Sequence, residues 1–549
     1  MISNQDSDWW KKAVFYQIYP RSFYDSNNDG FGDLVGVIKK LDYLNDGRGG
    51  GLGIDAIWFS PIFKSPQKDF GYDISDYCSI DPDYGTLADF DLLIEEAHRR
   101  GIRVVLDLVL NHSSDLHPWF VESRKDRTNP KQDWYVWVDA QADGSVPNNW
   151  LSLFGGKAWT FEEQRGQYYL HSFLQEQPDL NWYNPEVREE LAKVVRFWMN
   201  RGADGFRLDT VNFFAYDQKL RNNPRRDPDD PMLEKGQEAN PYFHYYTLYS
   251  KDRPENLEFI RFLRGLFDEK HGTTSIGEIG SNLGLEGTIK QTADYVKGTD
   301  HLHMAYTFAM LSTEMNAAFF ARVVELTEAH FGDSWPCWSL GNHDTCRLMT
   351  RFNCMGERQG FQQMMLMLLL CLKGTPILYY GEELDMEQIS FNQDQLKDPL
   401  GVYFWPQNKG RDGCRTPFPW KSDEPNQGFN LGAECWLPSG SPLALDEAEK
   451  MPESTLNLIR EMLKIRKQRP ALHSGKYLRL LLEEDCLVFK RETDQESITI
   501  AANFSAVERR LDHDLSNCRD LTPKGLIRRG RMEGMSLKLP PSGIFIGMH

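Results

Sequence analysis

The hexapeptide GFRLDT occupies residues 205–210 and gives the clearest indication of how the chain folds. It follows WMNRG (198–202), which is typical of a helix that ends at a glycine, and a short apolar strand is predicted over 203–211. Arg207 and Asp209 are two residues apart, so on a strand their side chains face the same way. A neighbouring guanidinium would keep Asp209 ionised and oriented, as a nucleophile or a base requires. The hexapeptide alone is also compatible with a structural ion pair.

Strands and helices alternate along the chain on both sides of this stretch. Apolar runs predict strands at 13–20, 54–61, 102–110, 203–211, 274–279, 302–308, 335–340 and 376–380. Amphipathic patterns predict helices at 34–44, 87–100, 185–200, 255–270, 287–296, 314–331, 359–372 and 454–469. Strands that each lead into a helix in this way predict an α/β fold, a (β/α)8 TIM barrel.

The alternation stops in three places, and these breaks predict the domain organisation. Residues 111–177 are polar and rich in Trp, which predicts a domain inserted after the third strand. This insertion divides the barrel into 1–110 and 178–470, and a Gly/Pro-rich segment at about 385–450 precedes the last helix. Residues 471–549 carry short alternating strands, such as 497–503 and 536–539, and we expect a C-terminal antiparallel β-sandwich.

Composition limits the partners and the compartment. The chain has 549 residues and a formal charge of −18, which disfavours nucleic acids and anionic membranes as partners. Its nine cysteines are scattered and include no C-x-x-C pair, as in a reduced cytoplasmic protein. No apolar run approaches the roughly 18 residues of a membrane span, and the first residues lack a signal-peptide core. We expect a cytoplasmic protein that is a monomer or a weak dimer.

The barrel hypothesis predicts where functional residues should lie. Active sites of such barrels form at the carboxyl ends of the strands. The third predicted strand ends in Asn111 and His112, the fourth in Asp209, the fifth in Glu278, and the seventh in GNHD at 341–344. Three carboxylates, two histidines and one arginine are therefore expected at one face, which favours a functional site over a set of unrelated ion pairs.

These strand ends carry a resemblance to a known family. DLVLNH (107–112), GFRLDT, the strand of Glu278 and NHD (342–344) resemble the four signature regions of the α-amylase superfamily of glycoside hydrolases. QPDLN (177–181), VFYQIYPRS (14–22) and KGRDGCRTPFPW (409–420) are similar to its oligo-1,6-glucosidase and α-glucosidase subfamily. The resemblance covers nearly the whole chain.

The resemblance implies a retaining α-glucosidase. Asp209 would be the nucleophile and Glu278 the acid/base, and Asp344 would grip sugar hydroxyls. Such an enzyme acts at chain ends and releases α-glucose from short α-glucosides such as maltose and sucrose, with transglucosylation as a further outcome.

The family pattern also implies the substrate-binding residues. Asp69 and Arg411 would bind the far hydroxyls of the terminal glucose, Tyr72 would stack on it, and His112 and His343 would hydrogen-bond it. The remaining implied contacts are Phe154, Phe173, Gln177, Arg207, Thr210 and Phe308. Taken singly, each Phe is more typical of a hydrophobic core. Thr210, in place of Val, goes with α-1,4 rather than α-1,6 linkages in the subfamily.

A metal site is expected in the first loop. Asp25, Asn27, Asp29 and Asp33 place oxygen ligands on alternate residues around a Gly bend, which suits a hard cation. The twelfth residue counted from Asp25 is a glycine, so this is not an EF-hand. The resemblance implies a structural Ca²⁺ or Mg²⁺ held by Asp25, Asn27, Asp29, the carbonyl of Phe31 and Asp33. The alternative is an acidic turn without an ion.

Other functions remain open at this point. An α-1,6-preferring oligo-1,6-glucosidase, a sucrose isomerase or a glucosyltransferase would keep the same three carboxylates. The charged, Pro-rich segment 222–240 is expected to shape the leaving-group site and so to influence this choice. A non-catalytic homologue associated with amino-acid transporters would instead lose those carboxylates and carry a transmembrane helix.

Overall fold

The chain folds around a closed barrel of parallel strands. The computed structural model describes residues 6–227, 229–230, 239–281, 283–352, 358–513 and 515–549. An 8-stranded sheet has the order β11-β10-β9-β5-β2-β1-β13-β12, and its neighbours pair in parallel. A parallel bridge between Ala305 and Pro336 joins the two edges of this sheet. The predicted TIM barrel is therefore confirmed.

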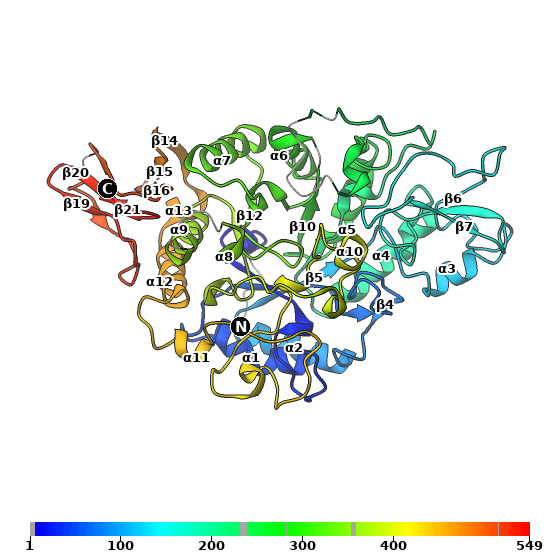
Figure 1. Cartoon of the computed structure of the whole chain (residues 1–549), viewed down its shortest axis with the longest axis horizontal. Helices are drawn as coiled ribbons and strands as arrows, with labels where there is room; N and C mark the ends of the chain where they lie inside the picture. Colours follow the sequence, from blue (N-terminus) through cyan, green and yellow to red (C-terminus); the bar gives the residue numbers. More distant parts are fainter. Residues whose placement is uncertain (1–5, 228, 231–238, 282, 353–357, 514) are drawn as a thin grey trace.

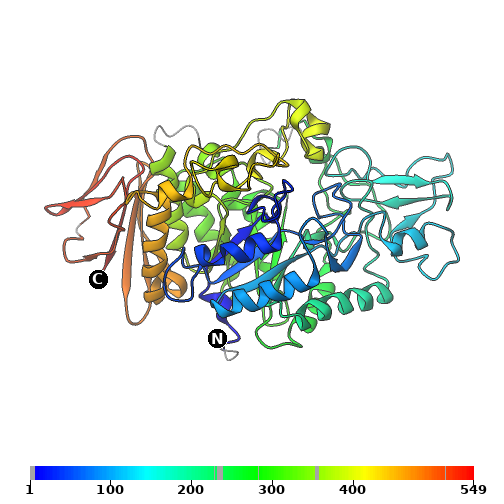
Figure 2. The same cartoon turned by 90° about the horizontal axis from the view of Figure 1, so that it is seen from below.

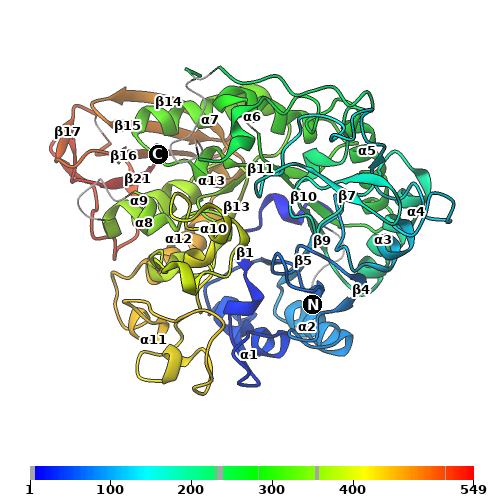
Figure 3. The same cartoon turned by 45° about the vertical axis from the view of Figure 1, so that its right-hand side comes forward.

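A long helix follows each barrel strand along the chain, and in Figure 3 helices lie around the barrel strands β1, β5, β9, β10, β11 and β13. The barrel strands are β1 (Phe15–Ile18), β2 (Ala56–Phe59), β5 (Arg103–Leu108), β9 (Gly205–Leu208), β10 (Thr274–Ile279), β11 (Met304–Thr307), β12 (Cys337–Ser339) and β13 (Thr375–Tyr379). The barrel helices are α1 (Leu34–Leu44), α2 (Leu87–Arg99), α4 (Pro185–Asn200), α5 (Asn256–Phe267), α6 (Gly284–Tyr295), α7 (Ala317–Phe331), α9 (Arg358–Leu370) and α12 (Thr455–Gln468).

Polar residues set where several of these helices begin. The side chain of Thr86 accepts from the backbone of Asp89, whose own side chain bonds back, and this capping box opens α2. Asn316 caps α7 by accepting from the backbone of Phe319. The helix predicted from residue 314 therefore begins at Ala317, three residues late, because Asn316 supplies a hydrogen bond that a helical turn would otherwise lack.

The strand predicted over 203–211 is shorter than expected. β9 ends at Leu208, and Thr210 has a left-handed backbone with φ of 41°. A β-branched residue rarely adopts this conformation. The turn takes Asp209 and Thr210 out of the sheet, so that both sit at the barrel mouth.

The barrel interior is filled by side chains from the strands and from the N-terminal segment. Phe15, Trp58, Ile276 and Met304 belong to one buried cluster that also contains Trp9 and Trp10. Trp9 and Trp10 lie on the 3-10 helix η1 (Trp9–Lys11), which is packed against the amino-terminal ends of the strands. The barrel is thus closed at one end and carries its polar residues at the other.

A small sheet stands at one side of the barrel. Between β5 and α4, the chain forms helix α3 (Pro118–Ser123) and an antiparallel sheet of β6 (Trp137–Val138), β8 (Gln167–Leu170) and β7 (Trp159–Glu162). A cluster with buried Trp150 and Trp159 forms its core. Nearby is the hairpin of β3 (Phe63–Lys64) and β4 (Asp76–Ile80). In Figure 2 the small sheet of β6, β8 and β7, drawn in cyan, lies at the end of the molecule opposite the C-terminal strands. The division at 111–177 stays a prediction.

The C-terminal region contains the two predicted antiparallel sheets. One has the order β14-β15-β16-β21-β18 and the other β17-β20-β19. Val488 and Ala501 of the first sheet share a buried cluster with Leu537 and Leu539 of the second, so the sheets pack face to face. Figure 1 shows them at one side of the barrel, beyond α7, α9 and α12. The strands are β14 (Lys476–Glu483), β15 (Cys486–Glu492), β16 (Ser497–Asn503), β17 (Arg509–Leu511), β18 (Arg519–Asp520), β19 (Arg531–Glu533), β20 (Ser536–Leu539) and β21 (Ile544–Met548).

Short helices connect these parts. Those in the loops are η2 (Pro20–Ser22), η3 (Val211–Phe213), η4 (Pro241–His244), η5 (Phe308–Leu311), α8 (Leu348–Arg351) and α13 (Pro470–Ser474). The segment predicted as an insertion at about 385–450 contains η7 (Gln393–Gln395), α10 (Pro399–Phe404), η8 (Asp412–Cys414), η9 (Pro425–Gly428) and α11 (Leu445–Ala448), and η6 (Glu382–Leu384) precedes it. Across the described residues, no helix is both long and apolar enough to cross a membrane. The eight cysteines within the described ranges form no disulfide.

Candidate active site

Arg207 brings three carboxylates together at the mouth of the barrel. Its Nη1 lies 2.9 Å from Oδ1 of Asp107 and 2.7 Å from Oδ1 of Asp209, and its Nη2 lies 2.6 Å from Oε2 of Glu278. These residues come from the adjacent strands β5, β9 and β10, or directly follow them. All four are buried, so the guanidinium offsets charges that water cannot solvate.

Burial raises the pKa values of Glu278 and Asp209, so that these groups exchange protons near neutral pH. Burial, together with the charges of Asp209 and Asp344, raises the pKa of Glu278 to about 7 against the opposing effect of Arg207. Burial also raises the pKa of Asp209 to about 7, again opposed by Arg207. Two interacting carboxyl groups of this kind titrate as a pair. Near neutrality they can share one proton, so that one is an acid and the other a carboxylate.

Asp344 is held in its ionised form on the other side of the cavity. Burial would raise its pKa, but His343, Arg411 and Arg415 lower it below its usual value. Oδ1 of Asp344 lies 3.1 Å from Nη1 of Arg411 and 3.0 Å from Nη2 of Arg415, and Oδ2 lies 3.2 Å from Nε2 of His343. Asp344 is therefore an acceptor for hydroxyl groups rather than a proton donor.

His343 connects this side to Tyr72. Gln17 donates its amide N–H to Nδ1 of His343 at 2.8 Å, which leaves the proton on Nε2. Nε2 lies 2.5 Å from the hydroxyl of Tyr72, and the two rings stack with an interplanar angle of 3°. The Tyr72 hydroxyl in turn donates to Asp107 at 3.1 Å. Tyr72 is thus fixed in orientation before any ligand enters.

Arg411 closes the floor of the cavity by reaching across to Asp69. Nη2 of Arg411 lies 2.7 Å from Oδ1 of Asp69, and Gln177 donates to the other oxygen of Asp69 at 3.2 Å. Asp398, which is fully buried, accepts from both Nε and Nη2 of Arg411 at 3.0 and 2.6 Å. This paired contact fixes the plane of the guanidinium.

The residues implied by the family resemblance lie around one cavity of about 380 Å³. The predicted residues in its wall are Asp69, Tyr72, His112, Phe154, Phe173, Asp209, Thr210, Glu278, Phe308, Asp344 and Arg411. Gln177, Arg207 and His343 lie behind this wall, in contact with Asp69, Asp209 and Tyr72 respectively. The roles assigned to these residues stay predictions.

Several residues at the site were not anticipated. Asp398 and Arg415 orient Arg411 and Asp344, and Tyr306 donates to Glu278 at 3.2 Å. Asn212 and Lys251 also line the cavity. Arg415 lies within the KGRDGCRTPFPW stretch, and Asp107 is the first residue of DLVLNH. The motifs therefore already contained these two site residues. Of segment 222–240, expected to shape the leaving-group site, residues 228 and 231–238 lie outside the described residues.

The expected cation loop lies away from this cavity. Asp25 and Asp33 are 2% and 5% exposed, yet within the described residues neither forms an ion pair. Asp25 accepts from the backbone of Asn28 at 2.6 Å and of Gly30 at 2.8 Å, and Asp33 caps α1 through Gly36 at 2.6 Å. Two buried carboxylates without a counter-charge fit a bound cation. However, no group of three or more His, Cys, Asp or Glu in the described ranges is arranged to hold a metal.

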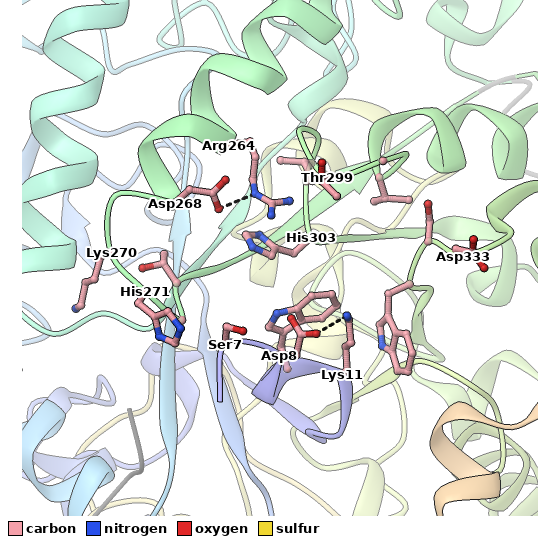
Figure 4. Close-up of a pocket in the computed structure, with 18 residues that line it drawn as sticks. Ser7, Asp8, Lys11, Arg264, Asp268, Lys270, His271, Thr299, His303 and Asp333 are labelled. Carbon is pink, nitrogen blue, oxygen red and sulfur yellow. Dashed lines mark hydrogen bonds and ion pairs between the residues drawn. The ribbon is translucent and has the colours of Figure 1, made fainter. Parts of the chain in front are cut away.

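A second cavity, of about 440 Å³, lies at the opposite end of the barrel, where β10, β11 and β12 begin (Figure 4). Two ion pairs, Arg264–Asp268 and Lys11–Asp8, are drawn there. None of the predicted site residues lines it. The carboxyl ends of the strands are therefore the stronger candidate for the active site.

A closed barrel with paired buried carboxylates and a small polar-floored cavity at its mouth is typical of enzymes that act on glycosidic bonds. Residues 17–475 match the family model described as alpha amylase, catalytic domain. The chain belongs to this α-amylase family.

Individual members of the family resemble the chain over almost its full length. A probable alpha-glucosidase of Rhizobium meliloti (strain 1021) is 44% identical over 98% of this chain and 97% of its own. An oligo-1,6-glucosidase of Parageobacillus thermoglucosidasius is 35% identical over 93% of this chain and 94% of its own. Among solved structures, the alpha-glucosyl transfer enzyme XgtA is 45% identical, with a TM-score of 0.91 over 98% of this chain and 99% of its own.

Proposed function

We propose that this protein is an exo-acting, retaining α-glucosidase that releases α-glucose from the non-reducing end of short α-glucosides such as maltose and sucrose. One observation carries the proposal. Asp209 and Glu278 both line the cavity, and both contact Arg207. The names of the similar proteins, an alpha-glucosidase among them, support this substrate class.

The chemistry follows from the two carboxyl groups. A carboxylate oxygen of Asp209 attacks C1 of the glucosyl unit while the bond from C1 to the leaving oxygen breaks. Glu278, whose pKa is raised to about 7, gives its proton to that oxygen. Glu278 then takes a proton from water, the water oxygen bonds to C1, and the ester to Asp209 breaks. Two inversions at C1 return the α configuration.

The cavity floor supports action at a chain end. The Asp69–Arg411 pair, at 2.7 Å, would block passage beyond the far hydroxyls of a glucose bound in the cavity. Tyr72, fixed by His343 and Asp107, offers a ring on which that glucose can stack. A longer chain can therefore enter only by its terminal unit.

Transfer of glucose to an acceptor other than water is a second outcome of the same site. Phe213, Tyr242, Phe243 and Phe308 give the cavity an aromatic wall, which excludes water from the glucosyl-enzyme. The similar structure of a glucosyl transfer enzyme supports this possibility. A non-catalytic homologue is disfavoured because Asp209, Glu278 and Asp344 are all present.

We further propose that Asp25, Asn27, Asp29, the Phe31 carbonyl and Asp33 hold a structural Ca²⁺ or Mg²⁺. An ion there would offset the buried charges of Asp25 and Asp33 and tie the loop to α1 through the Asp33 cap. A cytoplasmic location and a monomeric or weakly dimeric state stay predictions.

Anomer-resolved NMR of maltose hydrolysis tests the proposal. We expect α-glucose to appear first, and Asp209→Ala and Glu278→Gln each to remove nearly all turnover while the fold is retained. If β-glucose were released first, the double displacement would be wrong. Turnover that survived in folded Asp209→Ala would contradict the assignment of the nucleophile.

A further inference from the structure

The carbonyl oxygen of Gly280 receives two hydrogen bonds just beyond the strand that carries Glu278. Lys251 donates from Nζ at 2.5 Å, and Asn212 donates from Nδ2 at 2.8 Å. Gly280 is two residues after Glu278 and lines the same cavity, as do both donors. The end of β10 is therefore held from two sides at the point where the acid/base leaves the sheet.

Lys251 is unusually placed for a lysine. Its side chain is only 5% exposed and lies over the ring of Phe213, with Nζ 4.8 Å from the ring centroid. The carboxylate of Asp252 forms an ion pair with Nζ at 3.6 Å, but the shortest described contact of Nζ is the neutral carbonyl of Gly280. Burying an ammonium group has a high cost in free energy. If Lys251 serves to fix the position of the Gly280 carbonyl, that role would account for the cost of burying its ammonium group.

Asn212 extends the same arrangement towards the nucleophile. It is three residues after Asp209, and its Nδ2 also donates to Oδ1 of Asp252 at 2.5 Å. The backbone N–H of Asp252 donates back to the carbonyl of Asn212 at 2.9 Å. Gln291, on α6, donates to the same Asp252 oxygen at 2.6 Å. Asp252 itself has a left-handed φ of 58°, a strained conformation held in place by these bonds.

The direct contacts of the Glu278 carboxyl group come from the neighbouring strands and do not fix the backbone that follows it. Arg207, Tyr306 and the backbone N–H of Thr210 all approach it from β9 and β11 or from the turn after β9. Proton transfer requires heavy atoms within about 2.6–3.2 Å, and a displacement of about 1 Å can cost roughly a hundredfold in rate. How far Glu278 extends into the cavity depends on the course of the backbone at Gly280.

Close packing at Gly280 makes this backbone position sensitive. A Cβ on Gly280 would lie 3.3 Å from Cε2 of Phe308, whose ring forms part of the cavity wall. Phe308 thus leaves little room beside Gly280, and Lys251 and Asn212 hold the Gly280 carbonyl. Loss of a donor would let the backbone move away from the ring.

We propose that Lys251 is a positioning residue for the acid/base: together with Asn212 it fixes the Gly280 carbonyl and thereby sets the reach of Glu278 towards the leaving oxygen and the attacking water. This inference rests on the proposed function, because it assumes that Glu278 transfers protons in a double displacement. It adds residues to which neither the family signature nor the sequence analysis assigns a role.

The test compares Lys251→Met with a matched control, Lys270→Met. Lys270 also donates its Nζ to a backbone carbonyl, that of Met199 at 2.5 Å, but it lines the cavity at the opposite end of the barrel (Figure 4). Both substitutions keep the length of the side chain and remove one ammonium group. Asn212→Ala is a second variant that removes the other donor without touching a charge, should Lys251→Met fail to fold.

Two substrates separate proton transfer from binding. Maltose needs a proton on its leaving oxygen, whereas α-glucosyl fluoride releases fluoride without one. For Lys251→Met we expect kcat/KM on maltose to fall by about ten- to a hundredfold and kcat/KM on α-glucosyl fluoride to stay within about threefold of wild type. Lys270→Met should match wild type on both. An equal loss on both substrates would indicate general structural damage and would overturn the inference.

Azide distinguishes positioning of Glu278 from a direct contact between Lys251 and the leaving group. Azide attacks C1 of the glucosyl-enzyme without needing a base, breaks the ester to Asp209 and forms α-glucosyl azide. We expect azide to raise the turnover of α-glucosyl fluoride by Lys251→Met about tenfold and that of wild type little. A loss on maltose without azide rescue would instead assign Lys251 to the leaving-group site. If wild type cleaved neither substrate, the proposed function itself would fail.

Discussion

The backbone N–H of Thr210 donates to Oε2 of Glu278 at 3.2 Å. This contact exists because Thr210 adopts a left-handed backbone, with φ of 41°, immediately after Asp209. The turn therefore does two things: it ends β9 so that Asp209 faces the cavity, and it directs a donor at the residue proposed as acid/base. Strained backbone of this kind persists only where surrounding contacts fix it.

The Thr210 side chain leads to a prediction about linkage. Its Oγ1 donates to Oδ2 of Asp209 at 3.1 Å, so the hydroxyl contacts the proposed nucleophile. We expect wild type to prefer maltose and sucrose over isomaltose, and Thr210→Val to shift the ratio of kcat/KM towards isomaltose. Loss of the hydroxyl should also lower kcat on every substrate by about fivefold, equivalent to roughly 1 kcal/mol for a lost hydrogen bond.

Steady-state kinetics on the two disaccharides decides this prediction. Thr210→Ser, which keeps the hydroxyl, is the control and should retain the wild-type kcat. A wild type that prefers isomaltose would contradict the linkage assignment, as would a ratio that does not respond to Thr210→Val.

The raised pKa of Glu278 predicts an alkaline limit to activity. With a pKa of about 7, Glu278 loses its proton as the pH rises above neutrality. We expect kcat/KM on maltose to decline above about pH 7, because the free enzyme then lacks its acid. On α-glucosyl fluoride, which needs no acid, kcat/KM should not decline over this range. Parallel decline on both substrates would mean that another group sets the limit.

The same ionisation predicts that the folded state becomes less stable as the pH rises. A carboxylate in a salt bridge would have the opposite effect. The folded pKa of Glu278 lies above its usual value, so its contribution is fully present below about pH 4 and is lost as the pH rises through about 7. Glu278→Gln keeps the neutral form at all pH values. We expect it to be more stable than wild type at pH 8 by about 1–3 kcal/mol, and equally stable near pH 4. Denaturant titrations at the two pH values measure this difference, and equal stability at pH 8 would disprove the raised pKa.

Cation removal should affect the fold more than the chemistry. A bound ion stabilises the folded state by about 2.7 kcal/mol when it is present at 100 times its dissociation constant. We expect a chelator to lower the Tm while protein that remains folded keeps its activity. In Asp29→Ala, where an exposed ligand is lost, the Tm should start lower and respond little to the chelator. A metal-free sample, verified by elemental analysis, with an unchanged melting curve would rule out the site.

Asp398 should control substrate affinity through Arg411. Its two bonds to the guanidinium, at 2.6 and 3.0 Å, hold Arg411 against Asp69. In Asp398→Asn the negative charge is lost, and we expect KM for maltose to rise about tenfold or more with a smaller change in kcat, as for loss of binding shared by ground and transition states. Inhibition by glucose should weaken in parallel. A fall in kcat at constant KM would contradict this role.

The sequence predicted the barrel because its strands are short apolar runs that end in polar residues, and β10 was placed at its observed bounds. It also located Asp209, Glu278 and Asp344, since each ends or follows a barrel strand. The turn at Thr210 was missed because a β-branched residue normally favours a strand, and here tertiary contacts override that preference.

Residues that orient the site were harder to predict. Asp398 and Lys251 lie in long connections without regular periodicity, and their partners are 13 and 29 residues away. No spacing rule links a lysine to the carbonyl of a distant glycine. Only the closed barrel brings the loop that contains Lys251 and the end of β10 together.

Arg207 imposes a limit on how this site can be redesigned. It is completely buried and balances Asp107, Asp209 and Glu278 at once, so replacing it alone would strand three acidic groups away from water. Viable changes at this position must come in matched sets that alter the acids together with the base. Substitutions that change substrate preference should therefore occur in the loops around the cavity mouth, where single residues can be replaced independently.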